Sequence, residues 1–321
     1  MTRRPRREKG TALLSVLLIV AVMAAIAATA LDRLSLSTRL AGNAQVATQG
    51  RQWLAMAESL AAARLIEAAQ LSGGDQAALL GVERSITLPD GEIVRARIED
   101  GTNCFNVNAL ARRRASGELQ ATARRVFLFR DFLALLGLPE SRAQQLADAA
   151  ADAVDSDLLS RPLGNERLAN GDPVPNRALA SANELAAIEG MDAATWAMLR
   201  PWLCALPSHD PVTINVETLS PDRAALLAML DPEQISLGAA RAQLLARPRG
   251  GYGSVVDFWQ TGPLRGITPN QGRDAQVAVE TRFFRLVTRV GEGDGELRQE
   301  ALFSVEDDRA LLHARRWTST W

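Results

Sequence analysis

The feature that most constrains this chain is an uncharged segment, Thr11–Leu31, that directly follows a short basic leader. A helix of this length, rising ~1.5 Å per residue, spans about 30 Å, which is the thickness of the hydrocarbon core of a bilayer. The leader carries five basic residues and one glutamate, and such an excess of positive charge holds an N-terminus in the cytoplasm. The sequence therefore predicts one span of the bacterial inner membrane, with the body of the protein in the periplasm.

A secretory signal peptide is the alternative interpretation of the same segment. Ala28, Thr29 and Ala30 form an A-x-A cleavage pattern, and the apolar residues before them could serve as the hydrophobic region of a signal. However, alanine-rich helical sequence does not stop there but continues as far as Leu65. We therefore expect one long helix over residues 11–71, anchored in the membrane and kept in the mature protein.

Strand patterns occur near both ends of the remaining chain. Pro89–Gly91 has the composition of a tight turn, and apolar and polar residues alternate in the segment that follows it. Near the C-terminus, two further alternating segments flank the turn-rich residues 292–296, and residues 311–317 can add another strand. These strands can complete one antiparallel sheet with the first hairpin.

The intervening sequence has helical periodicity. Val126, Phe129 and Leu133 lie on one helical stripe, and Gly137 followed by Pro139 is a helix stop followed by a new start. We therefore expect an α+β fold. Its parts are a sheet domain from residues 75–103 and 276–321 and an inserted helical domain from residues 104–275.

The N-terminus resembles those of the type IV pilins and the pseudopilins of type II secretion. Their precursors carry a short basic leader ending in glycine, which prepilin peptidase removes before it methylates the new N-terminus. The resemblance implies that residues 1–10 are a prepilin leader, cut between Gly10 and Thr11. Most members have glutamate at the fifth mature position, where it is thought to neutralise the N-terminus of the subunit above, but this chain has Ser15.

A subunit with nothing above it needs no such carboxylate, because an unpaired carboxylate in lipid is costly. The missing glutamate and the large body resemble the K-type minor pseudopilins, the general secretion pathway protein K family. Three sequence segments resemble that family at corresponding positions: FNVNAL, TINVETLSPDRAALLAML and GYGSVVDFW. The resemblance implies a pilin-like domain with a large inserted all-α domain, at the tip of the pseudopilus, where it helps to start assembly and to export folded proteins. The implied partners are the I- and J-type minor pseudopilins, prepilin peptidase and the inner-membrane assembly platform.

Two stretches of the insert, residues 181–203 and 219–259, resemble helix-hairpin-helix units. They leave open an alternative function, a minor pilin or single-pass periplasmic protein that binds nucleic acid during DNA uptake. Such hairpins offer backbone N–H groups to a phosphate. Here the first hairpin contains Asp192, and residues 176–280 hold eight arginines against eleven acidic residues and no lysine. This charge balance favours a helical scaffold for protein contacts over nucleic-acid binding.

The two cysteines, Cys104 and Cys204, are candidates for a disulfide bond. A periplasmic location would be oxidising enough to join them in a disulfide. The alternative is two separate buried thiols, which behave as small apolar side chains. A metal site made from these two cysteines is disfavoured because both histidines lie far away in the sequence.

An acidic cluster between Asp148 and Glu166 raises the question of calcium. Asp152, Asp155, Asp157 and Glu166 could supply several of the hard oxygen ligands that calcium prefers. The family resemblance also implies calcium in the helical domain, without placing its ligands on this chain. Because the spacing is not that of an EF-hand loop, a solvated helix end remains the alternative interpretation.

Catalytic motifs do not account for this sequence. Its only histidines are His209 and His313, and it contains no G-x-S-x-G nucleophile motif. It also contains no phosphate-binding GxxxxGK[ST], no zinc-binding HExxH, and no GxGxxG placed between a strand and a helix. We therefore expect a non-enzymatic fibre subunit.

Overall fold

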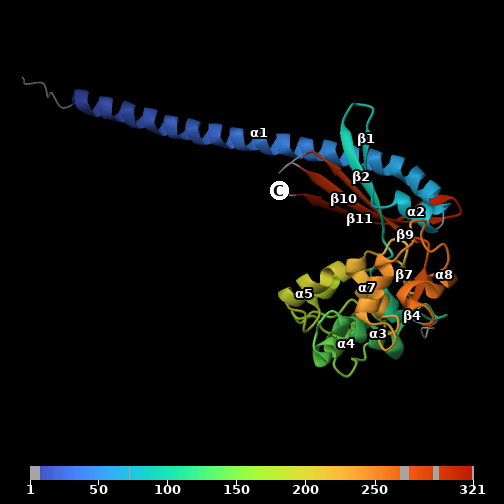
Figure 1. Ribbon diagram of the computed structural model, residues 1–321. Helices are drawn as coiled ribbons and strands as arrows, with labels where there is room; N and C mark the ends of the chain where they lie inside the picture. Colours follow the sequence, from blue (N-terminus) through green and yellow to red (C-terminus); the bar gives the residue numbers. More distant parts are fainter. Residues whose placement is uncertain (1–7, 72, 268–274, 292–295, 320–321) are drawn as a thin grey trace, which may run out of the picture.

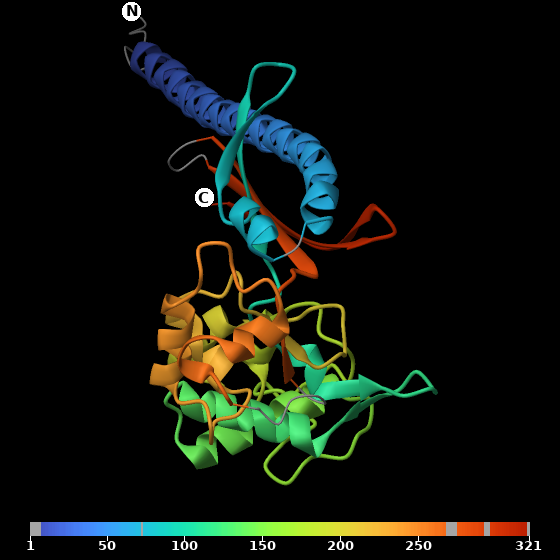
Figure 2. The same cartoon turned by 45° about the vertical axis from the view of Figure 1, so that its right-hand side comes forward.

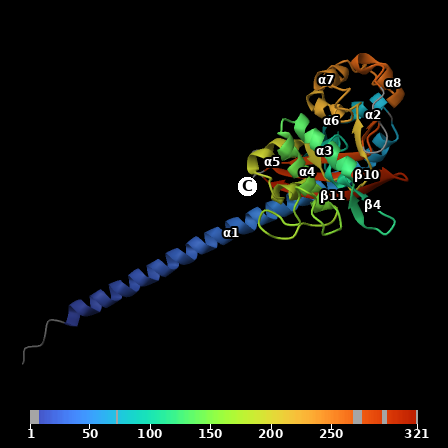
Figure 3. The ribbon, with the colours of Figure 1, turned by 90° about the horizontal axis from the view of Figure 1, so that it is seen from below.

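The computed structural model describes residues 8–71, 73–267, 275–291 and 296–319. Helix α1, Glu8–Ala69, is 62 residues long and extends far beyond the head of the molecule (Figures 1 and 3). Among the described residues it is the one helix long and apolar enough to cross a membrane. The expected long N-terminal helix is therefore confirmed.

The C-terminal part of α1 packs on a sheet because its small and aliphatic side chains recur at three- and four-residue spacing. This spacing places them on one face of the helix. The buried residues on that face are Leu54, Ala57, Ala61, Leu65 and Ala68. In contrast, the large apolar side chains of the N-terminal part, from Leu13 to Leu40, are exposed.

Five strands form one antiparallel sheet in the order β1-β2-β9-β10-β11. They are β1 (Glu83–Thr87), β2 (Ile93–Asp100), β9 (Phe283–Val290), β10 (Leu297–Glu306) and β11 (Arg309–Ser319). β2 pairs directly with β9, with Arg95 opposite Arg289, so the insert leaves from one strand and returns to its neighbour. The predicted antiparallel sheet is confirmed, and the turn expected at 292–296 falls almost wholly outside the described residues.

The first hairpin has the predicted turn. The backbone N–H of Leu88 donates to the carbonyl oxygen of Glu92 at 2.8 Å, and Gly91 adopts a φ of 89°, which glycine accommodates without strain. The hairpin projects across α1 (Figure 2). The short helix α2, Gly73–Leu79, follows α1 and lies near the start of β1, at the end of that strand opposite to the turn.

The insert forms a second lobe on the side of the sheet away from α1 (Figures 1 and 2). Its α-helices are α3 (Ala123–Leu135), α4 (Glu140–Val154), α5 (Ala193–Leu199), α6 (Ala224–Ala228), α7 (Leu237–Leu245) and α8 (Val255–Gln260). Its short 3-10 helices are η1 (Val107–Leu110), η2 (Ala182–Ala187), η3 (Arg200–Trp202), η4 (Pro221–Arg223) and η5 (Gly262–Leu264). The lobe has its own core, in which Phe105 packs against Phe129 and Phe132.

The insert also contains three short two-stranded sheets, which the expectation of an all-α domain does not include. They are β3 (Phe105–Asn106) with β6 (Leu203–Cys204), β4 (Ala111–Arg113) with β5 (Leu119–Ala121), and β7 (Val212–Asn215) with β8 (Ala275–Ala278). Strand β8 pairs in parallel with β7, so residues 276–278, which were expected in the sheet domain, belong to the insert. Two-residue strands carry too few side chains to produce a visible alternation, so sequence patterns do not reveal them.

The two lobes are joined through Asp100 at the end of β2. Its Oδ2 atom accepts hydrogen bonds from the Asn215 amide at 2.8 Å and from the hydroxyls of Thr218 and Thr281 at 2.6 and 2.7 Å. Because Asp100 belongs to the sheet lobe and its donors come from the insert and from the chain that returns to the sheet, one carboxylate connects three segments that lie far apart in the sequence.

Candidate functional site

The residues expected to be processed lie at the start of α1. Gly10 and Thr11 belong to the described helix, but their side chains and residues 1–7 lie outside the described part of the structure. Ser15 lies on the exposed surface of the same helix, one turn after Thr11. The bond between Gly10 and Thr11 thus lies at the N-terminal end of α1, ahead of the helix's apolar residues.

Cys104 and Cys204 form a disulfide whose Cα atoms are 5.8 Å apart. Both lie beside the parallel pairing of β3 with β6, which places Asn106 opposite Cys204. The sulfur atoms belong to a small apolar cluster with Leu206 and Phe283. The disulfide therefore ties the segment that leaves the sheet to a segment 100 residues further along the chain.

Three of the four candidate metal ligands meet at the C-terminal end of α4. Asp155 is the C-cap of this helix, Asp157 follows it, and Glu166 returns across the next loop. Each offers a carboxylate oxygen, and these oxygen atoms lie within 4.8 Å of one another. Three hard anionic oxygen atoms at this separation suit calcium, which prefers carboxylate and carbonyl ligands.

The fourth predicted ligand, Asp152, lies outside this group of three. Both of its carboxylate oxygens accept the backbone N–H of Arg161 at 3.1 Å. One turn earlier, Asp148 accepts the Nε–H of Arg161 at 2.9 Å and the backbone N–H of Leu163 at 3.3 Å. Gly164 is needed beside this pair because a Cβ atom there would overlap the Oδ2 atom of Asp152. Asp148 and Asp152 therefore hold the loop that brings Glu166 back to the cluster.

Burial and mutual repulsion raise the pKa values of these carboxyl groups. Desolvation raises the pKa of Asp155 to about 7, and the charges of Asp157, Asp152 and Glu166 add to the rise. The pKa of Asp152 is also raised to about 7, chiefly by burial. The pKa of Glu166 is raised by burial and by the charge of Asp157. A bound cation would remove the repulsion that otherwise favours protonation.

Unpaired oxygen atoms at the cluster fit a cation. Oδ1 of Asp155 and both carboxylate oxygens of Glu166 are buried, with no hydrogen-bond partner of ordinary geometry in the described chain. Buried anionic oxygens without donors are costly unless they are protonated or bound to a metal. The donor set of this cluster therefore matches the chemistry of a hard divalent ion.

Asn176 is a further candidate ligand that sequence reasoning missed. Its Oδ1 atom is buried without a partner among the residues that are described, and its side chain lies close enough to Glu166 to lower that residue's pKa. Asn176 has a φ of 49°, in the left-handed region that asparagine tolerates better than most residues. The sequence signal is weak, an asparagine directly after Pro175 in a turn, because its proximity to Glu166 arises only on folding.

The first helix-hairpin-helix unit uses its own charged groups at the position where a phosphate would bind. The Oδ1 atom of Asp192 accepts the backbone N–H of Thr195 at 2.8 Å and so caps α5. Arg142, on α4, donates to the Gly190 carbonyl oxygen and to the Oδ2 atom of Asp192. An incoming phosphate would have to displace an aspartate that already occupies the helix N-terminus.

In the second helix-hairpin-helix unit, a carboxylate of the protein also accepts backbone N–H groups. The Oε1 atom of Glu217 accepts the backbone N–H groups of Tyr252 and Gly253 at 2.7 and 2.9 Å. Glu217 is 3% exposed, so this carboxylate is an internal substitute for an external anion. In both hairpins, backbone N–H groups therefore donate to carboxylates of the protein itself, which disfavours phosphate recognition.

Comparison with known proteins identifies relatives that match this chain over nearly its whole length. Two sequence models described as "Type II secretion system (T2SS), protein K" match residues 103–208 and 214–280. The curated type II secretion system protein K of Klebsiella pneumoniae is 33% identical over 98% of both chains. That of Aeromonas hydrophila is 33% identical over 97% of both chains.

The fold is similar to that of a solved structure. A chain in the crystal structure of the GspK-GspI-GspJ complex from the enterotoxigenic Escherichia coli type 2 secretion system matches with a TM-score of 0.71 and 24% identity. The match covers 86% of this chain and 98% of that chain. The sheet with its long helix and large insert is therefore a fold already seen in that complex. From its sequence similarity to curated relatives over almost its whole length, this chain belongs to the type II secretion system protein K family.

Proposed function

We propose that this chain is the minor pseudopilin at the tip of the type II secretion pseudopilus, where it helps to start assembly and supports export of folded proteins across the outer membrane. The observation that carries the proposal is its membership of the protein K family over 98% of its length. The role is structural, and the family to which the chain belongs is a component of a secretion machine.

The long helix supports a role in a fibre. The side chains of its N-terminal part are exposed and apolar, as in Leu17, Ile19 and Leu31. Before assembly the subunit lies in the inner membrane with a cytoplasmic N-terminus, and these side chains contact lipid. After assembly they pack against neighbouring helices. Ser15 adds no carboxylate that would require a subunit above it. The insert, which widens the head on the side away from α1, would obstruct stacking above this subunit (Figure 1).

The proposed partners are the I- and J-type minor pseudopilins, by analogy with the GspK-GspI-GspJ complex whose GspK-like fold this chain shares. Prepilin peptidase would act at Gly10, and the inner-membrane assembly platform would extract the processed subunit. We also propose that Asp155, Asp157, Glu166 and Asn176 bind calcium, which would hold the end of α4 against the loop that follows it. The unpaired oxygen atoms support this part of the proposal.

The mature N-terminus tests the membrane-anchored function. Mass spectrometry of the protein purified from membranes should find methylated Thr11, whereas a secreted protein cut after Ala30 would begin at Leu31. A Gly10→Val variant should remain unprocessed and fail to restore secretion in a deletion strain. Gly42→Ala, in an exposed part of the same helix with no atom near the added Cβ, is the matched control and should restore it.

A gel-shift measurement at moderate salt separates secretion from DNA uptake. The detergent-solubilised protein should not retard single- or double-stranded DNA, because both hairpins are filled by internal carboxylates. Tight binding that weakens steeply with salt would instead support nucleic-acid uptake.

A further inference from the structure

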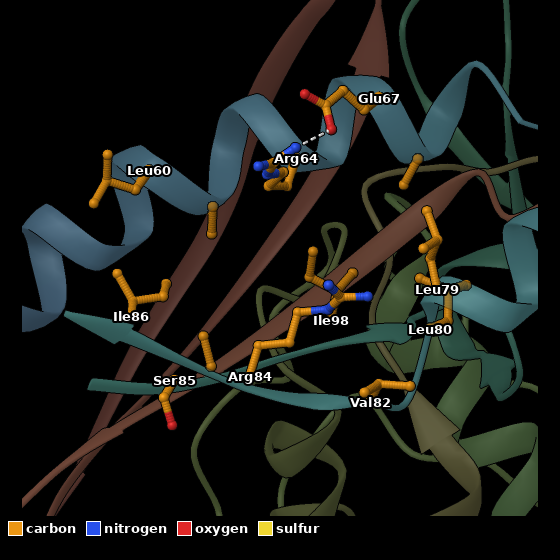
Figure 4. Close-up of a pocket in the computed structure, with 13 residues that line it drawn as sticks. Leu60, Arg64, Glu67, Leu79, Leu80, Val82, Arg84, Ser85, Ile86 and Ile98 are labelled. Carbon is orange, nitrogen blue, oxygen red and sulfur yellow. Dashed lines mark hydrogen bonds and ion pairs between the residues drawn. The ribbon is translucent and has the colours of Figure 1, made fainter. Parts of the chain in front are cut away.

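A groove of about 520 Å³ opens at the edge of the sheet, between the C-terminal part of α1, helix α2 and the β1–β2 hairpin (Figure 4). It forms because the buried face of α1 packs on the middle of the sheet, through Leu65 against Phe284 and Leu286, and leaves the edge strand β1 less covered. The groove lies on the sheet lobe, away from the acidic cluster of the insert.

The walls of this groove are mainly apolar. Ile86 and Ile98 are half-buried on the strand side, whereas three large apolar side chains at its margin are much more exposed. Leu60 of α1 is 53% exposed, Val82 before β1 is 47% exposed, and Leu79 at the end of α2 is 36% exposed. Figure 4 shows these side chains on three sides of one depression. Exposed apolar residues that meet at a concave surface mark an interaction site more often than scattered ones do.

Charge gives the groove a preferred kind of occupant. On its helix side, Arg64 is already paired with Glu67 at 2.6 Å. On its strand side, the guanidinium group of Arg84 makes no hydrogen bond or ion pair with any residue in the described ranges, and Figure 4 shows this side chain extending along the groove toward Ile98. A partner that places a carboxylate opposite Arg84 would complete a charge-assisted pair.

Strand β1 indicates that the partner would bind as an extended segment. Among the described strands, β1 is an edge strand that pairs only with β2, so its other side carries backbone donors and acceptors open to a further strand. Val82, Arg84 and Ile86 alternate along the chain, and all three line the groove. An added strand would place its own alternate side chains beside these three, beneath Leu60 and Leu79.

We infer that an extended segment of a neighbouring minor pseudopilin adds to the free edge of β1. On the face that meets the groove, its sequence has the pattern apolar-x-acidic-x-apolar. The apolar side chains contact Val82 and Ile86, and the acidic one pairs with Arg84. Backbone hydrogen bonds to β1 supply affinity, while the groove supplies specificity. This inference rests on the proposed function, because it takes the partner to be another subunit of the same tip.

Site-specific photocrosslinking of the full-length protein in secreting cells tests the inference. A benzophenone amino acid at position 82 should crosslink to one minor pseudopilin, and peptide mass spectrometry should map the crosslink to a segment with the pattern above. The same probe at position 256, an exposed residue of α8 in the insert, is the matched control and should not yield that product. Crosslinks from position 82 to a second copy of this chain, to an exported protein or to no protein would overturn the inference.

Charge reversal provides the second measurement. Arg84→Glu should reduce the crosslink by about tenfold, as for a residue central to an interface, and Arg84→Lys should retain most of it. Arg112→Glu, an exposed arginine on strand β4 of the insert, is the control and should leave it unchanged. Because the side chain of Arg84 makes no hydrogen bond or ion pair with the described residues, the thermal unfolding temperature should stay the same in all three variants. An undiminished crosslink in Arg84→Glu would contradict the inference.

The two proposals fail in different ways. If the unmodified chain restores secretion and co-purifies with I- and J-type subunits but the groove variants bind them normally, only the docking inference is wrong. If the unmodified chain neither restores secretion nor crosslinks to a minor pseudopilin from any position, the tip function itself is wrong.

Discussion

Glu58 on α1 and Arg315 on β11 form a two-point ion pair that holds the long helix on the sheet. The Nε atom of Arg315 donates to Oε2 of Glu58 at 2.9 Å, and its terminal nitrogen donates to Oε1 at 2.5 Å. Gln299 of β10 donates to the same carboxylate, and Glu58 as a residue is 7% exposed. The pair raises the pKa of Arg315, since the hydrogen bond to Glu58 stabilises its charged form.

Glu58→Ala should therefore weaken the docking of α1 on the sheet. We expect the free energy of unfolding in detergent to fall by about 2 kcal/mol, less than for a fully buried pair because Arg315 is partly exposed. Denaturant unfolding followed by circular dichroism measures the change. Glu67→Ala, which removes an exposed pair with Arg64 on the same helix, is the control and should cost less than about 0.5 kcal/mol. Equal losses in both variants would contradict this assignment.

Calcium binding at the end of α4 should depend on pH. The raised pKa of Asp155, about 7, means that calcium must displace a proton below neutral pH, so affinity should rise between pH 5.5 and 8. Isothermal titration calorimetry at both pH values measures it. Asp155→Asn and Glu166→Gln should each reduce the affinity, while Asp172→Asn, an exposed aspartate elsewhere in the insert, should not. Binding that is unchanged in both Asp155→Asn and Glu166→Gln would place any calcium elsewhere.

The stability of the metal-free protein should show the opposite pH trend. Burial raises the pKa values of Asp152 and Asp155 from the ordinary 3.8 to about 7 in the folded state. Between these values the folded state binds more protons than the unfolded state, so the free energy of unfolding falls as pH rises from about 4 to 7. Thermal unfolding in a chelator should therefore give a lower melting temperature at pH 7.5 than at pH 5. Excess calcium should reduce the difference, and a melting temperature that rises with pH in chelator would contradict the burial of these groups.

The Cys104–Cys204 disulfide should contribute strongly to the stability of the head. It closes a loop with a sequence separation of 100, for which the chain-entropy model gives up to ~4.7 kcal/mol. The double variant Cys104→Ala/Cys204→Ala should unfold at a markedly lower denaturant concentration. A reducing agent should destabilise the parent protein but not the double variant. If reduction leaves the unfolding midpoint of the parent unchanged, the disulfide is not a stabilising element.

Gly251 should be essential to the loop that surrounds Glu217. Its φ is 80°, and a Cβ atom there would lie 2.5 Å from Oε2 of Glu217. Gly251→Ala should therefore destabilise the insert by roughly 1–3 kcal/mol, the cost of strained backbone and displaced hydrogen bonds. Gly238→Ala, inside α7 with open space at its Cβ position, should be neutral or slightly stabilising. Thermal unfolding of both variants makes the comparison, and equal behaviour would show that the loop does not depend on Gly251.

Local patterns of the sequence determined the membrane helix, the β1–β2 turn and the stop at Gly137 before α4. These elements are predictable because each depends on residues within a few turns or strand positions of one another. The same locality explains what was missed. The two-residue strands β3 and β6 have no local signal, and β8 was assigned to the wrong lobe because its partner β7 lies about sixty residues earlier.

Residue type, the clustering of acidic residues along the chain and the family resemblance made the acidic residues and the cysteines candidates, but only the tertiary structure decided which of them meet. It brings Asp155, Asp157 and Glu166 together, uses Asp152 to hold a loop, and adds Asn176 from a turn ten residues after Glu166. It also creates the groove beside Arg84, whose walls come from three separate elements. The physical reason is that side-chain type and helical or strand periodicity are local properties, whereas the distances between groups on different elements are set by how helices, strands and loops pack within each lobe.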